Sequence, residues 1–293
     1  MNDSHRRTAN IVRGSILGMI LYLAVYVCCN LWLPLPPPWG DLVLNLFDVV
    51  AGGSAAFIAI LIWHHYRPPE ASYTIWKFLA LGLCSWVVAD TVWMIYNVTV
   101  IYVPTLSLAD LFYLLGYSFI LVALHRQFRL FYRPSSRRDT LITATFVAVG
   151  ILADLIITSL VASSQDFYKL NLGDYISILY PIADIAIAVI SIFFIRIFNR
   201  GAFARPWIGL TAFAISDSLF GWLALNNRYA YTILGSNIPS VISDSLYVAA
   251  YLILAALLLN YYFLILYGPS VVKYFAKITR DLDQADHGDQ KPD

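Results

Sequence analysis

Apolar residues in this chain are grouped in blocks, and a short polar or proline-rich stretch separates each block from the next. The blocks are about as long as the roughly 20 residues that a helix needs to cross a bilayer. The breaks between them are rich in Pro, Gly, Asn and Ser, which end helices and form turns. We therefore predict eight transmembrane helices, over residues 14–33, 42–64, 74–97, 107–125, 140–162, 174–197, 206–226 and 240–266.

The composition agrees with this pattern. Of the 293 residues, 60% are hydrophobic and 13% are charged, whereas about a quarter of the residues in a soluble domain are charged. The chain is thus predicted to be an all-α, polytopic protein of the plasma (inner) membrane, and a soluble enzyme is excluded. Prolines rather than a peptidase cleavage pattern follow the first apolar block, so we expect that block to remain as the first helix.

Lysine and arginine are unevenly distributed among the breaks, and their distribution predicts the orientation of the chain. When the N-terminus is placed in the cytoplasm, 17 of the 19 basic residues fall on the cytoplasmic side, including Lys77 at the edge of the third span. The opposite side holds only Lys169 and Arg228. Because basic residues in short loops stay in the cytoplasm, we predict that both termini are cytoplasmic.

The two halves of the chain resemble each other. The stretches "LADLFYLLGY", residues 108–117, and "ISDSLYVAAY", residues 242–251, share the spacing Asp-x-x-Tyr-x-x-x-Tyr and lie 134 residues apart. The stretch "VADTVWMIYN" from Val88 likewise matches "ISDSLFGWLALN" from Ile215. Four spans are an even number, so two copies of such a unit would have the same orientation and form a parallel repeat.

The predicted organisation therefore consists of two parallel four-helix repeats between two cytoplasmic tails. Apolar residues recur with helical spacing at the start of the second tail, and we expect an amphipathic segment there, followed by a disordered end. The four regions are the N-terminal tail 1–13, the first repeat 14–133, the second repeat 134–267 and the C-terminal tail 268–293.

One aspartate lies in each predicted span after the first, although the only Lys or Arg residues in these spans are Lys77 and Arg196, near predicted cytoplasmic ends. An aspartate at the centre of a bilayer costs roughly 2.5–3.5 kcal/mol on insertion scales, and such a residue is by default a candidate for a functional site. In the predicted orientation none of these aspartates lies in the cytoplasmic half. They are Asp48, Asp90, Asp110, Asp154, Asp184, Asp217 and Asp244.

Several of these aspartates are followed by an aromatic residue three positions later, on the same face of the predicted helix. Tyrosine hydroxyls and the tryptophan N–H can form hydrogen bonds with a carboxyl group, and clustered carboxyls without a cation are expected to be partly protonated. We predict an outward-facing vestibule of carboxyl and aromatic groups that binds a ligand; hydrogen bonds between helices, without a ligand, are the alternative. The candidate ligand-binding residues are Asp90, Trp93, Asp110, Tyr113, Tyr117, Asp184, Asp217, Asp244, Tyr247 and Tyr251.

No motif indicates a metal or a cofactor. The three cysteines lie in apolar segments without a CxxC pattern, so no disulfide framework or metal site is expected. His64, His65 and His125 fall at predicted cytoplasmic helix ends, and we interpret them as interfacial residues rather than ligands. The expected partners are membrane lipids, a small cationic or amphipathic ligand and a separate cytoplasmic signalling protein, but not nucleic acid.

The stretch "PTLSLADLFYLLGYSFILVALHR", residues 104–126, resembles the Pro-Ser-x-Ala-Asp-x-x-Tyr-Leu-x-Gly-Tyr motif of membrane input domains. Such eight-helix domains precede diguanylate cyclases, phosphodiesterases and histidine kinases in bacteria. This resemblance implies a membrane-embedded sensory or ligand-binding module. We expect the module to lack a catalytic output domain of its own.

A second stretch, "AISDSLFGWLALN", is similar to the second-half motif of lysoplasmalogenase-like membrane hydrolases. These enzymes also have eight helices, and their first-half Gly-Asp motif corresponds here to Ala89-Asp90. This resemblance implies an intramembrane lipid hydrolase as the alternative function. Hydrolysis requires a carboxylate as general base on a water molecule, and Asp90 and Asp217 would be the catalytic candidates.

Overall fold

The computed structural model describes residues 3–32, 38–99, 106–131, 172–198, 201–225 and 237–268, together with position 145. In this part of the chain, all the regular secondary structure is helical, and the predicted all-α fold is confirmed there. The helices are α1 (Asp3–Trp32), α2 (Trp39–His65), α3 (Ala71–Thr99), α4 (Leu108–Phe131), α6 (Leu172–Ile197), α7 (Arg205–Leu225) and α8 (Ile238–Tyr267), with a 3₁₀ turn η2 (Ala202–Ala204) before α7.

Six of the described helices are long and apolar enough to cross a membrane, so the chain has the architecture of a multi-pass membrane protein. The exception, α7, contains the polar sequence Ser216-Asp217-Ser218 in its middle. The fifth predicted span, residues 140–162 with Asp154, lies outside the described residues. Helix α1 begins earlier than predicted, because residues 3–12 of the expected tail continue the helix. The six candidate spans are Arg13–Trp32, Trp39–His65, Ala71–Thr99, Leu108–Leu130, Leu179–Ile197 and Ile238–Tyr267.

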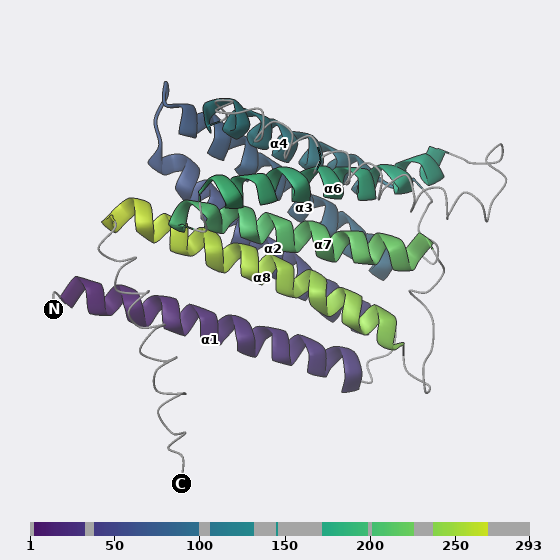
Figure 1. Cartoon of the computed structure of the whole chain (residues 1–293). Helices are drawn as coiled ribbons and strands as arrows, with labels where there is room; N and C mark the ends of the chain where they lie inside the picture. Colours follow the sequence, from purple (N-terminus) through teal and green to yellow (C-terminus); the bar gives the residue numbers. More distant parts are fainter. Residues whose placement is uncertain are drawn as a thin grey trace, which may run out of the picture.

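The helices lie side by side in one bundle, and α1 runs along its edge (Figure 1). Helix α3 packs between α2 and α4, and α7 packs between α6 and α8. The contacts of α2 with α8 and of α4 with α6 connect the first half of the chain to the second. Helix α1 contacts α8 and α2, and only 6% of its apolar window is buried.

Both pairs of helices that connect the halves are parallel. Along α4 and α6, Tyr117 contacts Asp184 and Phe128 contacts Phe193, so residue numbers rise together. Along α2 and α8, Gly52 lies against Tyr251, and the hydroxyl of Tyr66 lies 3.1 Å from that of Tyr261. Because α4 and α6 run in the same direction, the end of α4 and the beginning of α6 lie at opposite ends of the bundle.

Two glycines allow neighbouring helices to approach closely. A Cβ atom on Gly82 of α3 would lie 2.5 Å from Cγ1 of Ile120 on α4. A Cβ atom on Gly209 of α7 would lie 2.7 Å from Cδ1 of Leu254 on α8. Small residues at such crossings permit tight helix packing in membranes. The pairs α3–α4 and α7–α8 are therefore each held at a distance that a larger residue would not permit.

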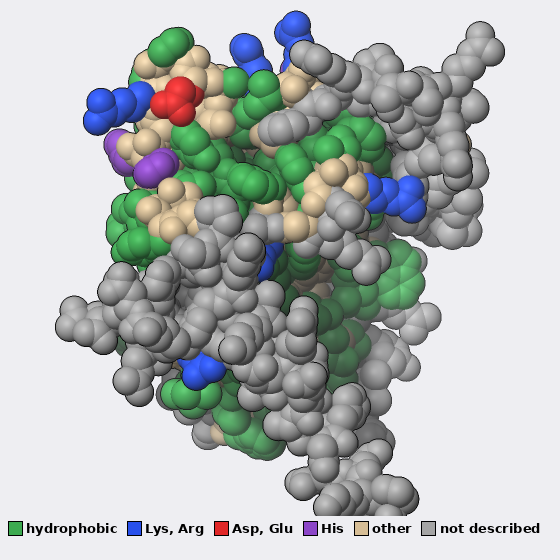
Figure 2. Space-filling model, turned by 60° about the vertical axis from the view of Figure 1, so that its left-hand side comes forward, with side chains coloured by type: hydrophobic (Ala, Val, Ile, Leu, Met, Phe, Trp, Pro, Cys, Tyr) green, Lys and Arg blue, Asp and Glu red, His purple; other side chains and the backbone are tan. Residues whose placement is uncertain are grey.

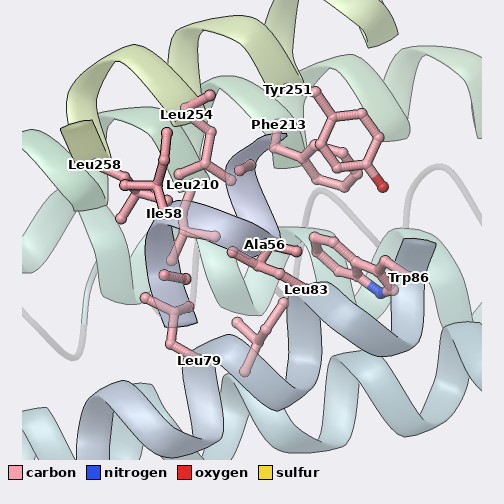
Figure 3. Close-up of a cluster of buried hydrophobic side chains, with 14 of the residues drawn as sticks. Ala56, Ile58, Leu79, Leu83, Trp86, Leu210, Phe213, Tyr251, Leu254 and Leu258 are labelled. Carbon is pink, nitrogen blue, oxygen red and sulfur yellow. The ribbon is translucent and has the colours of Figure 1, made fainter. Parts of the chain in front are cut away.

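The interior of the bundle is apolar and joins both halves (Figure 3). The indole of Trp86 on α3 stacks on the ring of Phe213 on α7, with centroids 4.4 Å apart. Toward the start of α3, Leu79 and Leu83 are fully buried against Leu210 and other aliphatic side chains. One turn beyond Trp86, α3 carries the buried carboxyl of Asp90. The polar site thus begins where this apolar core ends.

Charged side chains gather at the end of the bundle that holds the N-terminus (Figure 2). Helix α2 ends there with His64 and His65, and the last turns of α4 and α6 contain Arg129 and Arg196. Helix α1 begins and α8 ends at this same end (Figure 1). Among the described helices, basic groups therefore lie at the end of the apolar bundle that holds the N-terminus.

Candidate functional site

Asp90 of α3 is the centre of a buried group of tyrosines. Its side chain is 5% exposed, and its Oδ1 accepts a hydrogen bond of 2.6 Å from the hydroxyl of Tyr113 on α4. Two tyrosines of α8 donate to the same carboxyl: Tyr251 to Oδ2 at 2.9 Å and Tyr247 to Oδ1 at 3.2 Å. One carboxyl group therefore joins three helices from both halves of the chain.

A second group forms around Asp217 of α7. The hydroxyl of Tyr117 lies 2.5 Å from Oδ2 of Asp217 and 2.7 Å from Oδ1 of Asp184 on α6. The two carboxyl groups are also close enough to act on each other electrostatically. A hydroxyl has one hydrogen and an ionised carboxylate has none to donate, so this arrangement requires a proton on one of the two carboxyls.

In each of these two groups, an aspartate of one half of the chain accepts a hydrogen bond from a tyrosine of the other half. Asp90 of the first half accepts from Tyr251 of the second half, and Asp217 of the second half accepts from Tyr117 of the first half. In the aligned stretches of the sequence, Asp90 matches Asp217 and Tyr117 matches Tyr251. The two carboxyls are also close enough to act on each other electrostatically. They therefore belong to one network, which we call the Asp–Tyr network.

Asp110 caps the beginning of α4. It is the third residue of that helix, and its Oδ2 accepts hydrogen bonds from the backbone N–H and the hydroxyl of Ser107, at 2.7 and 2.8 Å. This is the reciprocal half of a capping box. Its Oδ1 accepts from the hydroxyl of Tyr180 on α6 at 2.6 Å. The aspartate thus starts a helix and ties it to the second half.

Asp48 and Asp244 form the edge of the site. Asp48 of α2 is close enough to Asp90 and to Asp244 of α8 for each to act on it electrostatically. Its Oδ1 is buried and has no hydrogen-bond partner. The carboxyls of the site therefore extend from α6 through α7 and α3 to the beginning of α2 and α8.

Packing fixes the tyrosine rings that donate to Asp90. The ring of Tyr251 is fully buried, lies 4.8 Å from the ring of Phe213 and contacts Gly52. Figure 3 shows Tyr251 and Phe213 side by side, above Trp86. The indole N–H of Trp86 donates to the carbonyl of Tyr113 at 3.3 Å. Aromatic packing thus orients the hydroxyls before any ligand is bound.

The described partners of Asp90, Asp184 and Asp217 are tyrosine hydroxyls, not cations. Within the described ranges, no group of three or more His, Cys, Asp and Glu side chains is placed to hold a metal ion. The described contacts of these three carboxyls are hydrogen bonds with tyrosine hydroxyls.

Most of the residues predicted from the sequence lie in or beside the Asp–Tyr network. The exception is Trp93, whose side chain is 37% exposed on the surface of α3. The interpretation that an aspartate pairs with the aromatic residue three positions later is wrong for Asp90 and Asp110. Asp90 accepts from tyrosines of α4 and α8, and Asp110 accepts from Tyr180 of α6. Spacing along one helix does not determine which neighbouring helix supplies the partner.

Sequence reasoning missed three participants. Ser107 had a readable signal, because Ser107-x-x-Asp110 is a capping-box pattern before an apolar run. Tyr180 lies four residues before Asp184 and so shares a helix face with it, which was also visible in the sequence. Asp48 was recognised as an intramembrane aspartate but was not included among the site residues.

No family model matches the chain, and neither a curated protein nor a solved structure is found to be similar to it. The residues of the site are thus the basis for any functional conclusion.

Proposed function

We propose that the protein is a membrane-embedded sensory or ligand-binding module, in which the Asp–Tyr network couples its two halves. The observation that carries this proposal is a reciprocal pair of hydrogen bonds between the halves. Tyr117 of the first half donates to Asp217 of the second, and Tyr251 of the second half donates to Asp90 of the first. A proton or a ligand that competes for either carboxyl must displace a tyrosine of the opposite half. Occupancy of the site and the relative position of the halves are then linked, as a sensor requires.

The two halves are, in this proposal, copies of one four-helix unit. Three features support this: the reciprocal hydrogen bonds between the halves, the equivalent close approaches at Gly82 and Gly209, and the parallel pairs α2–α8 and α4–α6. Since α4 and α6 run in the same direction, an odd number of membrane crossings must separate them. The fifth span predicted at 140–162 would supply one crossing, which makes eight.

The proposed orientation places both termini in the cytoplasm. The basic end of the bundle supports this orientation, because Arg129, Arg196 and both ends of the described chain lie on that side. The Asp–Tyr network then lies in the outer half of the plasma membrane, beyond the apolar core. A proton or small cation would reach it from outside, and a separate cytoplasmic partner would detect the movement of the helix ends. This role agrees with the resemblance to bacterial membrane input domains.

The proposal is tested by measuring the distance between the halves. Spin labels at Arg129 and Leu266, both exposed in the last turns of α4 and α8, would be attached in a background without Cys28, Cys29 and Cys84. We expect the distance distribution in nanodiscs to differ between pH 5 and pH 8.

We expect Asp90→Asn and Asp217→Asn to abolish that difference, while Asp41→Asn, an exposed residue of α2, should retain it. If the labelled protein with Asp90 and Asp217 intact gives the same distance distribution at pH 5 and pH 8, the proposal is wrong.

One observation favours the alternative function, an intramembrane lipid hydrolase. Asp184 and Asp217, which both contact the hydroxyl of Tyr117, require one proton between them, and such a pair can supply an acid and a base together. Incubation with lysophospholipids and vinyl-ether analogues tests this function. Turnover that Asp90→Asn or Asp217→Asn abolishes in folded protein would support the hydrolase and contradict the sensor.

A further inference from the structure

Exposure decreases from the beginning of α4 and α6 toward the Asp–Tyr network. Asp110 and Tyr180, in the first third of these helices, are partly exposed. Deeper along the same two helices, Tyr117 is only 4% exposed and Asp184 only 1%. Tyr180 precedes Asp184 by four residues, so the two lie one turn apart on the same face of α6. Tyr180 therefore lies between Asp184 and the end of the bundle opposite the basic groups, which is the outer end in the proposed orientation.

The ring of Tyr180 packs against two tyrosines of the network. Its centroid lies 6.2 Å from that of Tyr113 and 5.9 Å from that of Tyr117, both on α4. Tyr113 donates to Asp90, and Tyr117 donates to Asp217. One ring thus packs against hydroxyl donors of both carboxyl groups.

The hydroxyl of Tyr180 holds this ring against α4. It donates to Oδ1 of Asp110 at 2.6 Å, and Asp110 is itself fixed at the start of α4 by two hydrogen bonds from Ser107. Because Asp110 is partly exposed, water can replace the tyrosine as its donor. The ring of Tyr251, in contrast, is fully buried against Phe213. Tyr180 can therefore move without disturbing the apolar core, and Tyr251 cannot.

Pro181 follows Tyr180 directly and lies inside α6. Proline has no backbone N–H, so the hydrogen bond to the carbonyl four residues earlier is missing and a helix bends more easily there. Beyond Pro181, α6 is anchored in the core, where the ring of the fully buried Phe194 lies 5.0 Å from that of Trp207. The part before Pro181 has several large side chains that are exposed, namely Leu172, Tyr175 and Leu179. This first part of α6 is thus held less firmly than the rest.

We propose that Tyr180 is a gate, which controls the access of protons from the outer end of the bundle to Asp184 and Tyr117. In the closed state, which the structure describes, Asp110 holds the hydroxyl of Tyr180 and the ring covers the network. The gate opens when water replaces the hydroxyl at Asp110 and the first part of α6 pivots at Pro181. This inference rests on the proposed sensory function and names how access to its site is regulated.

The first test measures how fast the proton shared by Asp184 and Asp217 exchanges with solvent. The protein in nanodiscs is transferred from H₂O to D₂O at neutral pH, and the carboxyl band that Asp184→Asn removes is followed in the infrared as deuterium replaces hydrogen. We expect this exchange to be at least about tenfold faster in Tyr180→Ala, because the bond to Asp110 no longer opposes opening. Tyr180→Phe, which keeps the ring but loses that bond, should give an intermediate rate.

The neighbouring Leu179, exposed on the same helix, provides the matched control. Leu179→Ala should exchange at the unsubstituted rate. If Tyr180→Ala does not fold, Tyr180→Phe decides the result. An unsubstituted rate in the folded Tyr180 variants would overturn the gate, and so would the absence of the band, since there would be no proton for Tyr180 to shield.

Pro181→Ala separates opening of the gate from general loss of stability. It restores the backbone N–H and stiffens α6, so we expect slower exchange, opposite in sign to Tyr180→Ala. General destabilisation would instead accelerate exchange in both variants, and acceleration in Pro181→Ala would overturn the pivot. The sensor proposal has its own readout. If the distance change between pH 5 and pH 8 persists while the exchange rates do not respond, the gate is wrong and the sensor survives.

Discussion

The ring of Tyr251 rests on Gly52, so closely that a methyl group on the glycine would lie 3.2 Å from Cζ of the tyrosine. The same ring carries the hydroxyl that donates to Asp90. Helix α2 thus positions a hydrogen bond between α8 and α3 without a side chain of its own at that point. The next residue, Gly53, has open space where a Cβ atom would lie, which provides an exact control.

We expect Gly52→Ala to destabilise the protein relative to Gly53→Ala. Both substitutions add the same methyl group to the same helix, so their effects on helix propensity are equal. Gly52→Ala also presses on a fully buried ring that packs against Phe213, and overpacking costs about 1–3 kcal/mol. Thermal unfolding of both variants measures the difference. Equal unfolding temperatures would mean that the ring moves freely and that Gly52 does not position Tyr251.

The cap of α4 predicts that two Asp→Asn substitutions differ in their effect on stability. Asp110→Asn retains one acceptor oxygen but replaces the other with a donor, so either the bond from Ser107 or the bond from Tyr180 is lost. We expect a loss of stability of about 0.5–2 kcal/mol, as for other caps. Asp41→Asn in the first turn of α2, where no side chain caps the helix, is the control. If both variants unfold at the same temperature, the capping contacts contribute nothing.

Apolar runs predicted where the helices lie, but they could not predict which faces meet. Asp90 and Trp93 were grouped because they are three residues apart, yet Asp90 points into the bundle and Trp93 lies at its surface. Residues three apart differ by about 60° around a helix, and that difference separates an interior face from a lipid-facing one. Both faces of a membrane helix are apolar, so hydrophobicity does not distinguish them.

Short sequence patterns within one helix can predict some contacts of the site, whereas contacts between distant residues cannot be predicted in this way. Asp110 was interpreted as an intramembrane carboxyl, although Ser107-x-x-Asp110 is the pattern of a helix start. By contrast, the bond from Tyr117 to Asp217 joins residues 100 positions apart. It depends on how α4, α6 and α7 are placed in three dimensions, and only the similarity of the two halves hinted at it.

The crossing of α7 and α8 predicts a third result. A methyl group on Gly209 would lie 2.7 Å from Cδ1 and 2.8 Å from the backbone Cα of Leu254, so a side-chain rotation cannot relieve the contact. On the same helix, a methyl group on Gly221 would meet only Pro181 at an ordinary 3.6 Å. We expect Gly209→Ala to lower the unfolding temperature strongly and Gly221→Ala to change it little. Similar small effects would show that α7 and α8 can separate without cost.

The last prediction concerns the proton that Asp184 and Asp217 share. The hydroxyl of Tyr117 lies within hydrogen-bond distance of both carboxyls but has one hydrogen, so one carboxyl must be protonated to donate to its oxygen. The infrared spectrum at neutral pH should therefore contain the carbonyl stretching band of a protonated carboxyl. Asp184→Asn should remove it, because the amide can donate to the hydroxyl of Tyr117 in place of the proton.

Asp41→Asn should leave this band unchanged, since Asp41 is exposed on α2 and is not one of the two carboxyls of the pair. Tyr117→Phe should keep the band but shift it, because the pair then loses the hydroxyl between its oxygens while the proton remains. If the band is absent at neutral pH, both carboxyls are ionised. Two adjacent carboxylates would repel each other in the apolar bundle, so they would need a bound cation, and the shared-proton account of this pair would be wrong.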